Sequence, residues 1–498
     1  QVMRSGQDAD FWSIGYGMVE MPKKTLKLKQ PLPPAKAKRG GRGKRPAAKA
    51  RPEVKADGSA RLAAFTVLKD ILVNNMVSDA ALAQNKIFAA LERRDRAFAR
   101  LLVTSCLRRY GQTQKIIDHC LSKPASDDIT LILHLGLVQL LFLDTSPHAA
   151  TNTSVELART LKQDRATGLV NAVMRRAIRE QDSLLGLTSV LDNLPAALKA
   201  SWAAAYGPEQ TAAIAELAMT TPPLDLTLKP DADQTKLAEA LAGVHLQDHT
   251  LRCHFDGDIR QMPSYEDGLW WVQDAAAALC GTLAKADPGK IIWDLCAAPG
   301  GKAAQLAAAG AEVTAVDADA RRLDRLKANM NRLGLAAEVI EADILSAEFN
   351  RMATKARPDV ILLDAPCSAT GTIRRRPDIL VRSKELELAE LKSRQTEMLA
   401  AALRWVKSDG FVLYATCSLQ PEEGEQVVTE VISKGLAMLD SFASEELGLF
   451  SPALSTEGWV RALPTCLSGE RLPPAKAGTY SETGNDGFFI ARLRPVTA

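Results

Sequence analysis

Two cysteines follow apolar runs in short polar turns, where they could support thiol chemistry. Cys367 lies in DAPCSATGTIRRRPD (364–378) and Cys417 lies in YATCS (414–418). If both runs are strands of one parallel sheet, both thiols reach the edge where such sheets bind ligands. A lone cysteine at a strand end is usually a small buried apolar residue. Two of them, in a chain without a C-x-x-C pair, favour nucleophilic chemistry by a thiolate.

A turn of small residues precedes these cysteines in the segment DLCAAPGGK at 294–302. Two alanines, a proline and two glycines let the backbone turn sharply and approach a ligand at the start of a helix. The segment is not a G-x-G-x-x-G fingerprint, which disfavours an NAD-dependent oxidoreductase. The alternative interpretation is an ordinary strand-to-helix turn.

Two aspartates at the ends of apolar runs could hold a nucleoside cofactor. Asp317 is placed to accept hydrogen bonds from both hydroxyls of a ribose. Asp343 could contact an adenine amino group, although it could instead cap a helix.

The sheet that must position these residues is visible as a series of short apolar runs. The predicted strands are Ile291–Leu295, Glu312–Val316, Glu338–Ile340, Val360–Asp364 and Phe411–Thr416. Helical patterns separate them at Gly301–Ala308, Ala320–Leu333 and Leu386–Lys407. Apolar strands that alternate with helices predict a parallel, doubly wound α/β sheet.

The rest of the chain predicts three further parts. Residues 60–185 show apolar residues at helical spacing throughout, and residues 193–268 mix helical stretches with one strand over Leu224–Leu228. The predicted organisation is a disordered basic arm (1–58), an all-α bundle (59–190), a small α/β connector (191–268) and a C-terminal α/β Rossmann-like domain (269–498).

Composition excludes several classes of protein. The 498 residues are 46% hydrophobic and 24% charged, as in globular proteins of about three domains. No run reaches the ~18 apolar residues of a membrane helix, and the nearest, Leu131 to Leu143, contains His134 and Gln139 and predicts a buried core helix. The cysteine and histidine spacings predict neither a disulfide framework nor a metal site, so a reducing, cytoplasmic location fits best.

Residues 265–498 resemble the RNA cytosine-C5 methyltransferases that use S-adenosylmethionine. The resemblance rests on the segments DLCAAPGGK (294–302), DAPCSATGTIRRRPD (364–378), YATCS (414–418) and DGFF (486–489). Residues 60–185 resemble a helical, antitermination-factor-like RNA-binding domain. The pairing is similar to the bacterial 16S ribosomal RNA cytosine-C5 methyltransferases of the Fmu/Sun family.

The resemblance implies S-adenosylmethionine as cofactor, 16S ribosomal RNA as partner, and no metal. Asp317 would hold the ribose and Asp343 the adenine side, while Asp364 would lie beside both cofactor and target base. The turn would line the methionine and ribose portion through Cys296, Ala297, Ala298, Pro299, Gly300, Gly301 and Lys302.

The resemblance also implies a division of labour between the two thiols. C5 of cytosine is too weakly nucleophilic to take a methyl group unaided, but a thiolate that adds to C6 makes C5 enamine-like. Cys417 matches the nucleophile of the family, Cys367 the cysteine that helps to release the product, and Asp364 is a candidate hydrogen-bond partner for N3. Among the five other cysteines none matches a catalytic motif, so structural roles are expected for Cys106, Cys120, Cys253, Cys280 and Cys466.

Arginines after the Cys367 turn are expected to contact RNA phosphates near a flipped-out base, unless they are ordinary surface charges. They are Arg374, Arg375 and Arg376. One departure from the family is the Glu423-Gly424-Glu425 segment, where the family often has Glu-Asn-Glu. The alternatives that stay open are a transfer-RNA cytosine methyltransferase and a non-catalytic RNA-binding assembly factor, and the presence of both cysteines argues against the latter.

The net charge of +3 conceals a basic arm. Residues 1–60 hold 14 Lys and Arg against 5 Asp and Glu, a net of +9, so the rest of the chain carries −6. Such arms usually meet nucleic acid. We expect deletion of residues 1–55 to weaken RNA binding and to flatten its salt dependence in titrations, without changing the methylated position. Unchanged affinity and salt slope would reduce the arm to a solvated tail.

Overall fold

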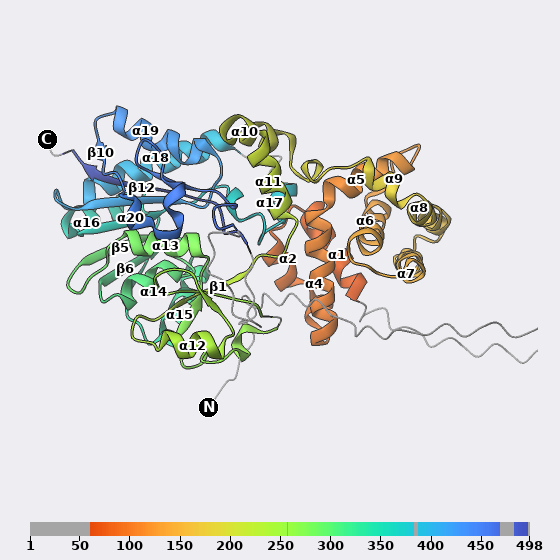
Figure 1. Ribbon diagram of the computed structural model, residues 1–498, viewed down its shortest axis with the longest axis horizontal. Helices are drawn as coiled ribbons and strands as arrows, with labels where there is room; N and C mark the ends of the chain where they lie inside the picture. Colours follow the sequence, from red (N-terminus) through yellow and green to blue (C-terminus); the bar gives the residue numbers. More distant parts are fainter. Residues whose placement is uncertain (1–59, 256, 383–386, 469–482, 497–498) are drawn as a thin grey trace, which may run out of the picture.

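The computed structural model describes residues 60–255, 257–382, 387–468 and 483–496. The predicted basic arm, 1–58, lies outside the described residues. A bundle of helices forms one side of the molecule and a large α/β unit forms the other (Figure 1). A small antiparallel sheet lies beside the α/β unit.

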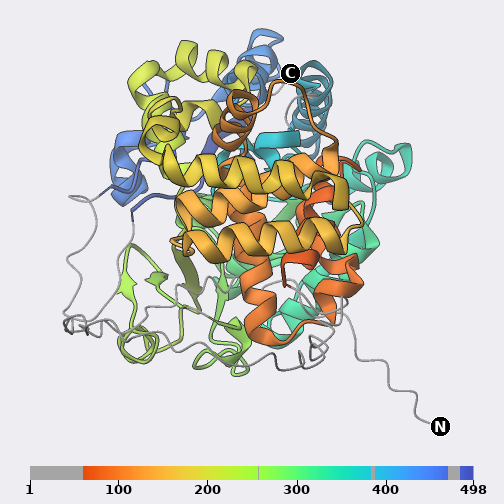
Figure 2. The ribbon, with the colours of Figure 1, turned by 90° about the vertical axis from the view of Figure 1, so that its right-hand side faces the viewer.

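The N-terminal part is a bundle of helices, as the sequence predicts. Its elements are α1 (Ala60–Leu72), α2 (Ser78–Gln84), α3 (Lys86–Ala89), α4 (Arg93–Arg108), α5 (Tyr110–Cys120), α6 (Asp127–Phe142), α7 (Pro147–Thr160), η2 (Asp164–Ala166), α8 (Thr167–Arg179) and α9 (Gln181–Gly186). Figure 2 shows these helices stacked side by side on the face that turns away from the large sheet.

Helix α6 forms the core of this bundle, where it packs against α1, α4, α5, α7 and α8. The side chains of His134 and Gln139 are buried in this helix, and both are hydrogen-bonded. His134 is 1% exposed, and its Nδ1 lies 2.6 Å from the hydroxyl of Thr113. Burial lowers the pKa of His134 to about 3, so the ring is neutral. The prediction of a buried core helix is confirmed.

Two helices of the predicted connector pack against the α/β unit rather than against the small sheet. After η3 (Val190–Asn193), helices α10 (Ala196–Tyr206) and α11 (Pro208–Ala218) bury Trp202 and Ile214 against residues near the Cys367 turn, such as Ile373 and Leu380. The small sheet has a separate core around Leu226. The connector therefore contributes to two hydrophobic cores rather than one, because Trp202 on α10 packs against the α/β unit.

The small sheet is antiparallel, with strand order β2-β3-β1-β4. Its elements are β1 (Leu224–Leu228), α12 (Gln234–Ala240), β2 (Val244–His245), β3 (Thr250–Cys253), η4 (Ile259–Gln261) and β4 (Trp270–Val272). The sequence predicts the strand β1 but none of the other three strands. Strands of two to four residues are too short to show a periodic pattern.

The large sheet contains five parallel strands, β5 (Ile291–Leu295), β6 (Glu312–Asp317), β7 (Glu338–Glu341), β8 (Val360–Asp364) and β9 (Phe411–Thr416). All five match predicted strands. The order is β10-β12-β9-β8-β5-β6-β7, with β10 (Ala437–Leu439), β11 (Val460–Ala462) and β12 (Phe488–Pro495). Strand β12 runs antiparallel to β9, so the sheet is mixed and not purely parallel as predicted.

Helices cover both faces of the large sheet and bury a separate core on each. One face carries α13 (Ala275–Leu283), α14 (Gly301–Ala308) and α15 (Ala320–Leu333), and the other carries α16 (Ala347–Ala356), α18 (Leu388–Trp405) and α19 (Glu425–Ser433). The connecting elements are η5 (Thr370–Thr372), α17 (Asp378–Arg382), η7 (Pro421–Glu423), α20 (Ser444–Leu447) and η8 (Gly448–Ala453).

The helical bundle docks on the segment that follows the Cys367 turn. The hydroxyl and backbone N–H of Ser78 donate to the carboxylate of Asp378, at 3.0 and 3.3 Å. A guanidinium nitrogen of Arg108 donates to the carbonyl oxygen of Arg374 at 2.8 Å. The bundle is thus tied directly to the region that carries the predicted chemistry.

Candidate active site

The two predicted thiols meet at the carboxyl edge of the large sheet. Strands β8 and β9 are parallel neighbours, and each leads into one of the cysteine turns. The Sγ atoms of Cys367 and Cys417 lie 3.5 Å apart. At this distance one thiol can donate a hydrogen bond to the other sulfur.

Gly371, in the Cys367 turn, is hydrogen-bonded to the Cys417 turn and to a third segment that contains Gly487. Its backbone N–H donates to the carbonyl of Cys417 at 2.9 Å, and its carbonyl accepts from the N–H of Gly487 at 2.8 Å. A Cβ atom at position 371 would lie 2.1 Å from the carbonyl oxygen of Gly487 and 2.8 Å from that of Cys417. A glycine is therefore required for this approach of three backbones.

Cys367 is held in its protonated form. Its pKa is raised well above that of an ordinary thiol, first by the hydrogen bond to Cys417, then by burial, by the charge of Cys417 and by the carboxylate of Glu423. Cys367 therefore keeps its proton and can donate a hydrogen bond to the sulfur of Cys417.

The DLCAAPGGK segment forms the turn between β5 and α14. Cys296 and Gly300 adopt left-handed backbone conformations, with φ of 64° and 102°. Helix α14 starts at Gly301, and its N-cap residue, Gly300, has no side chain to cap the first turn. The N–H groups at this positive helix end can therefore donate hydrogen bonds to a polar ligand. Burial raises the pKa of the Cys296 thiol, and its predicted contact with the cofactor stays a prediction.

Lys302 links this turn to the Cys367 strand. Its ammonium nitrogen lies 2.8 Å from the carboxylate oxygen Oδ2 of Asp364. Burial lowers the pKa of Lys302, but the charge of Asp364 and other nearby groups outweighs it and holds the pKa above its usual value. The side chain of Asp364 is 28% exposed. The pair therefore leaves a carboxylate at the edge of the sheet that can still meet a ligand.

Asp317 lies at the end of β6, directly beside the turn. Its carboxylate accepts the N–H groups of Ala298 and Asp319, both at 3.1 Å, and pairs with Arg322 at 3.2 Å. Arg322 is 46% exposed and also donates to the carbonyl of Ala298, and contact between Asp317 and a ribose stays a prediction. A buried carboxylate next to an uncapped helix start fits a nucleoside cofactor such as S-adenosylmethionine.

Asp343 follows β7 and is half-exposed. Its carboxylate accepts the N–H of Leu345 at 3.0 Å and lies 3.5 Å from a guanidinium nitrogen of Arg394. The first contact closes a local turn, in line with the capping alternative. Contact between Asp343 and an adenine stays a prediction.

A pocket lies beside the DLCAAPGGK turn. Its lining residues are Ile259, Tyr265, Trp271, Val272, Pro299, Gly301, Asn329 and Arg332. Pro299 and Gly301 reach it, but none of the three predicted cofactor aspartates does. Binding of the cofactor at the strand ends stays a prediction.

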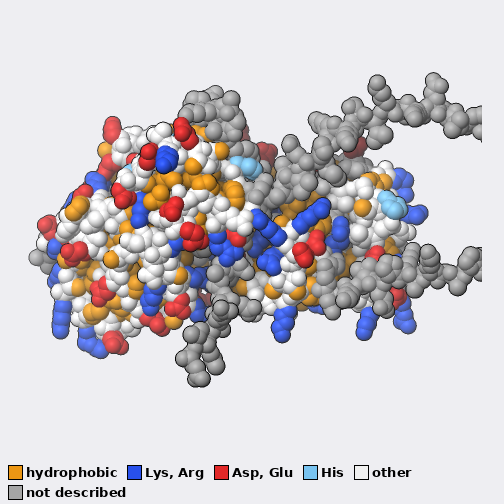
Figure 3. Space-filling model, turned by 90° about the horizontal axis from the view of Figure 1, so that it is seen from below, with side chains coloured by type: hydrophobic (Ala, Val, Ile, Leu, Met, Phe, Trp, Pro, Cys, Tyr) orange, Lys and Arg blue, Asp and Glu red, His pale blue; other side chains and the backbone are white. Residues whose placement is uncertain are grey.

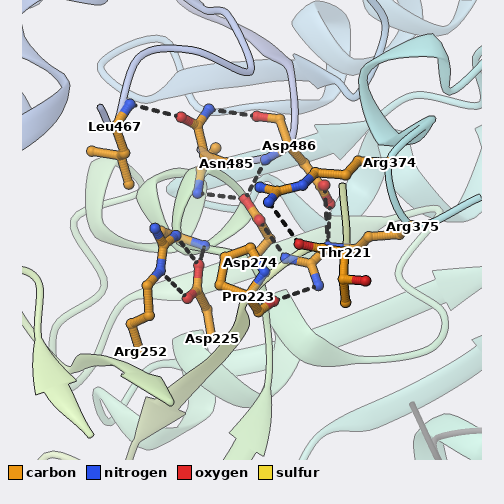
Figure 4. A network of polar contacts seen from close by, with 12 residues as sticks. Thr221, Pro223, Asp225, Arg252, Asp274, Arg374, Arg375, Leu467, Asn485 and Asp486 are labelled. Carbon is orange, nitrogen blue, oxygen red and sulfur yellow. Dashed lines mark hydrogen bonds and ion pairs between the residues drawn. The ribbon is translucent and has the colours of Figure 1, made fainter. Parts of the chain in front are cut away.

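Two of the three arginines predicted to contact RNA point into the protein (Figure 4). Arg374 is 6% exposed and donates to the carbonyl oxygens of Thr483 and Thr221 at 2.7 and 2.6 Å. Arg375 lies 2.7 Å from the carboxylate of Asp274 and 3.1 Å from that of Asp486. The prediction of phosphate contacts is therefore wrong for Arg374 and Arg375. For the partly buried Arg376 it stays a prediction.

The Arg375 network joins distant segments of the chain (Figure 4). Asp274 also caps α13, accepts the backbone N–H of Asp486 at 3.1 Å, and lies near the ion pair of Asp225 with Arg252 (2.7 Å). A run of arginines is expected to face solvent. Here carbonyls and carboxylates of the connector and of the DGFF segment converge on it instead.

Sequence reasoning missed the role of Glu423, which is fully buried between the two cysteine turns. The only signal was its nearness to the YATCS segment. The neighbouring Gly424 departs from the family, and its place is explained by Arg461. A Cβ atom at position 424 would lie 2.5 Å from the Arg461 guanidinium, which donates to the carbonyl of Ser418 at 2.6 Å and pairs with Glu425 at 2.6 Å.

None of the remaining cysteines lies in a catalytic motif. Burial raises the pKa of Cys253 and of Cys280 to about 12, and Cys106 and Cys466 are also buried. Across the described ranges, no group of three or more His, Cys, Asp or Glu side chains is arranged to hold a metal ion. A search of the same residues finds no helix with the length and apolarity needed to span a membrane.

Two family models match the chain. The model described as 16S rRNA methyltransferase RsmB/F matches residues 282–494, and that of the NusB family matches residues 58–179. A curated relative, Ribosomal RNA small subunit methyltransferase B of Escherichia coli O127:H6, is 34% identical over 416 residues, which cover 80% of this chain and 90% of the relative.

Solved structures share the fold. PH0851 superimposes with a TM-score of 0.65 at 20% identity and covers 87% of this chain and 98% of its own. NSun6 from Pyrococcus horikoshii with SFG gives a TM-score of 0.50 at 19% identity and covers 62% of this chain and all of its own.

Proposed function

The chain belongs to the 16S rRNA methyltransferase RsmB/F family, and from that premise we propose that it transfers a methyl group from S-adenosylmethionine to C5 of a cytosine in 16S ribosomal RNA. The observation that carries the proposal is the pair of thiols with Sγ atoms 3.5 Å apart. C5 methylation needs a nucleophile at C6 and later proton transfers, and a thiol pair suits both tasks. A cytoplasmic location, where ribosomal subunits form, is part of the proposal.

Cys417 acts as the nucleophile. Its thiolate forms a bond to C6 of the cytosine, and the electron pair of the C5=C6 double bond makes C5 nucleophilic. S-adenosylmethionine, when bound, supplies an electrophilic methyl group on a positively charged sulfur. Once C5 carries the methyl group, a base removes the C5 proton, the double bond forms again, and the C6–S bond breaks to return the thiolate.

Cys367 assists the last of these steps. Because it is protonated and within hydrogen-bonding distance of Cys417, it can stabilise the thiolate that departs from C6. Asp364 stands before it at the strand end, with Oδ2 held by Lys302. The other carboxylate oxygen is our candidate acceptor for the protonated N3 of the cytosine.

Basic side chains where the helical bundle meets the α/β unit support an RNA substrate. Burial raises the pKa of Asp79, while Arg376, Arg100 and Arg325 lower it, so arginines from three separate segments approach one point. Lys and Arg side chains gather at this junction in the view of Figure 3. A cluster of this kind attracts phosphates regardless of sequence.

Bisulfite sequencing of 16S ribosomal RNA and transfer RNA, from cells with and without the gene, tests the proposal. We expect one 5-methylcytosine to disappear from 16S ribosomal RNA. Loss from transfer RNA instead would favour the transfer-RNA alternative. Unchanged methylation in both pools would leave the non-catalytic RNA-binding role.

A further inference from the structure

A buried carboxylate, that of Glu423, contacts both cysteine turns. Its oxygen Oε1 accepts the backbone N–H of Ser368 at 2.8 Å. Its oxygen Oε2 accepts the hydroxyls of Ser368 and Ser418, each at 2.5 Å. Because Ser368 follows Cys367 and Ser418 follows Cys417, one carboxylate bonds the neighbour of each thiol.

Further hydrogen bonds complete this cluster, which we name the serine–glutamate cluster and define as Ser368, Thr370, Gln395, Ser418 and Glu423. Gln395 is 0% exposed and donates to Glu423 Oε1 at 3.0 Å, and also to a carbonyl in the Cys367 turn at 2.9 Å. The hydroxyl of Thr370 lies 3.2 Å from that of Ser418. The two turns are thus joined by side chains as well as by backbone.

The burial of this carboxyl group depends on its hydrogen bonds, because burying a carboxylate costs free energy unless it is fully hydrogen-bonded or paired. Glu423 is 0% exposed, and within the described ranges it has no Lys or Arg within ion-pair distance. Hydrogen bonds from Ser368, Ser418 and Gln395 replace the counter-ion. The two carboxylate oxygens therefore serve as the acceptors that join the two turns.

We propose that Glu423 is a positioning residue, because its hydrogen bonds hold the turns of Cys367 and Cys417 in register so that both thiols can reach one base. The catalytic consequence rests on the proposed function, but the state of the thiols does not. A misplacement of reacting groups by ~1 Å can cost about 10²-fold in rate. Loosening the cluster is expected to act on that scale.

The test compares Glu423→Gln with Glu422→Gln, a matched change in the same η7 turn that removes no hydrogen bond to either serine in the described structure. We expect Glu423→Gln to lower kcat by about 10²-fold with little change in KM for RNA or S-adenosylmethionine. Glu422→Gln should keep wild-type kcat. Equal kcat for both variants would overturn the proposal.

A second readout needs no RNA. The pKa of Cys367 is raised by its bond to Cys417, by burial and, in smaller part, by Glu423, so removing that charge should let Cys367 ionise at lower pH. Iodoacetamide labelling of Cys367, mapped by mass spectrometry across a pH series, should shift to lower pH in Glu423→Gln only. Loss of kcat without this shift would reduce Glu423 to a structural residue.

The two readouts separate failure of the inference from failure of the proposed function. A wild-type protein without methyltransferase activity would refute the function, while the labelling shift would still test the effect of Glu423 on Cys367. If Glu423→Gln does not fold, Ser418→Ala removes a single donor to the same oxygen. It is expected to lower kcat by about 10-fold at unchanged KM, and unchanged kcat would overturn the proposal.

Discussion

Cys417→Ala is expected to lower methylation of 16S ribosomal RNA by ~10⁴-fold or more, because removing a nucleophile commonly costs at least this much. Without the thiolate, C5 of the cytosine stays too weakly nucleophilic to accept a methyl group. The assay is transfer of labelled methyl from S-adenosylmethionine to RNA. Denaturing gel electrophoresis of the same reactions should show no covalent protein–RNA species.

Cys367→Ala should behave differently from Cys417→Ala. Addition to C6 and methylation at C5 use Cys417, but the partner that stabilises the departing thiolate is gone. A covalent protein–RNA adduct should therefore accumulate and survive denaturing electrophoresis, while turnover falls.

Cys120→Ala is the control, since Cys120 ends α5 in the helical bundle and matches no catalytic motif. It should keep wild-type turnover and show no adduct. Normal turnover by Cys417→Ala would refute the role of that residue. An adduct in Cys417→Ala but not in Cys367→Ala would exchange the two roles.

Arg375→Ala should have the largest effect on stability. Asp274 and Asp486 have side chains that are 4% and 9% exposed, and without Arg375 both would keep uncompensated buried charge. Breaking a buried ion pair by removing one partner costs about 3–5 kcal/mol. Urea or thermal unfolding measured by circular dichroism would show this loss in the free energy of unfolding.

The loss should depend on pH. Burial, opposed by Arg375, raises the pKa of Asp486 to about 7, above the value in an unfolded chain, so folding favours its protonated form. Without Arg375 that pKa rises further. Protonation at lower pH then removes the unpaired charge, and the variant should lose less stability at pH 5.5 than at pH 8.

Two variants check the explanation for Arg375. Arg375→Lys keeps the charge but not the planar fork that reaches both carboxylates, so it should fall between wild type and Arg375→Ala. Arg351→Ala, at an exposed position on α16, should change stability by no more than about 0.5 kcal/mol. A loss at Arg375 no larger than at Arg351 would show that the network is not stabilising.

The parallel strands and the meeting of the two thiols could be predicted because they depend on local patterns. Strand β8 is buried on both faces and is apolar up to Asp364, β5 is apolar apart from Asp294, and the carboxyl ends of parallel strands must lie at the same edge of the sheet. Once Cys367 and Cys417 are assigned to neighbouring strand ends, their proximity follows. The turn before α14 is local in the same sense.

The antiparallel strand and the internal partners could not be predicted because they depend on contacts between distant segments. Strand β12 pairs with β9 across a long stretch of chain, and no local pattern states its direction. Arg375 looks like surface charge until Asp274 and Asp486 are brought to it by folding. In the sequence, Glu423 has the pattern of a solvent-facing acid in a short turn. In the fold, Ser368 and Ser418, from the turns after β8 and β9, donate hydrogen bonds to it.

Mass spectrometry of the wild-type protein after incubation with S-adenosylmethionine and 16S ribosomal RNA containing 5-fluorocytidine tests the central claim most directly. Fluorine at C5 cannot leave as a proton, so the release step is blocked and the C6–S bond persists. We predict one RNA-derived adduct on the peptide that contains Cys417. Absence of an adduct, or attachment at Cys367, would contradict the covalent role of Cys417.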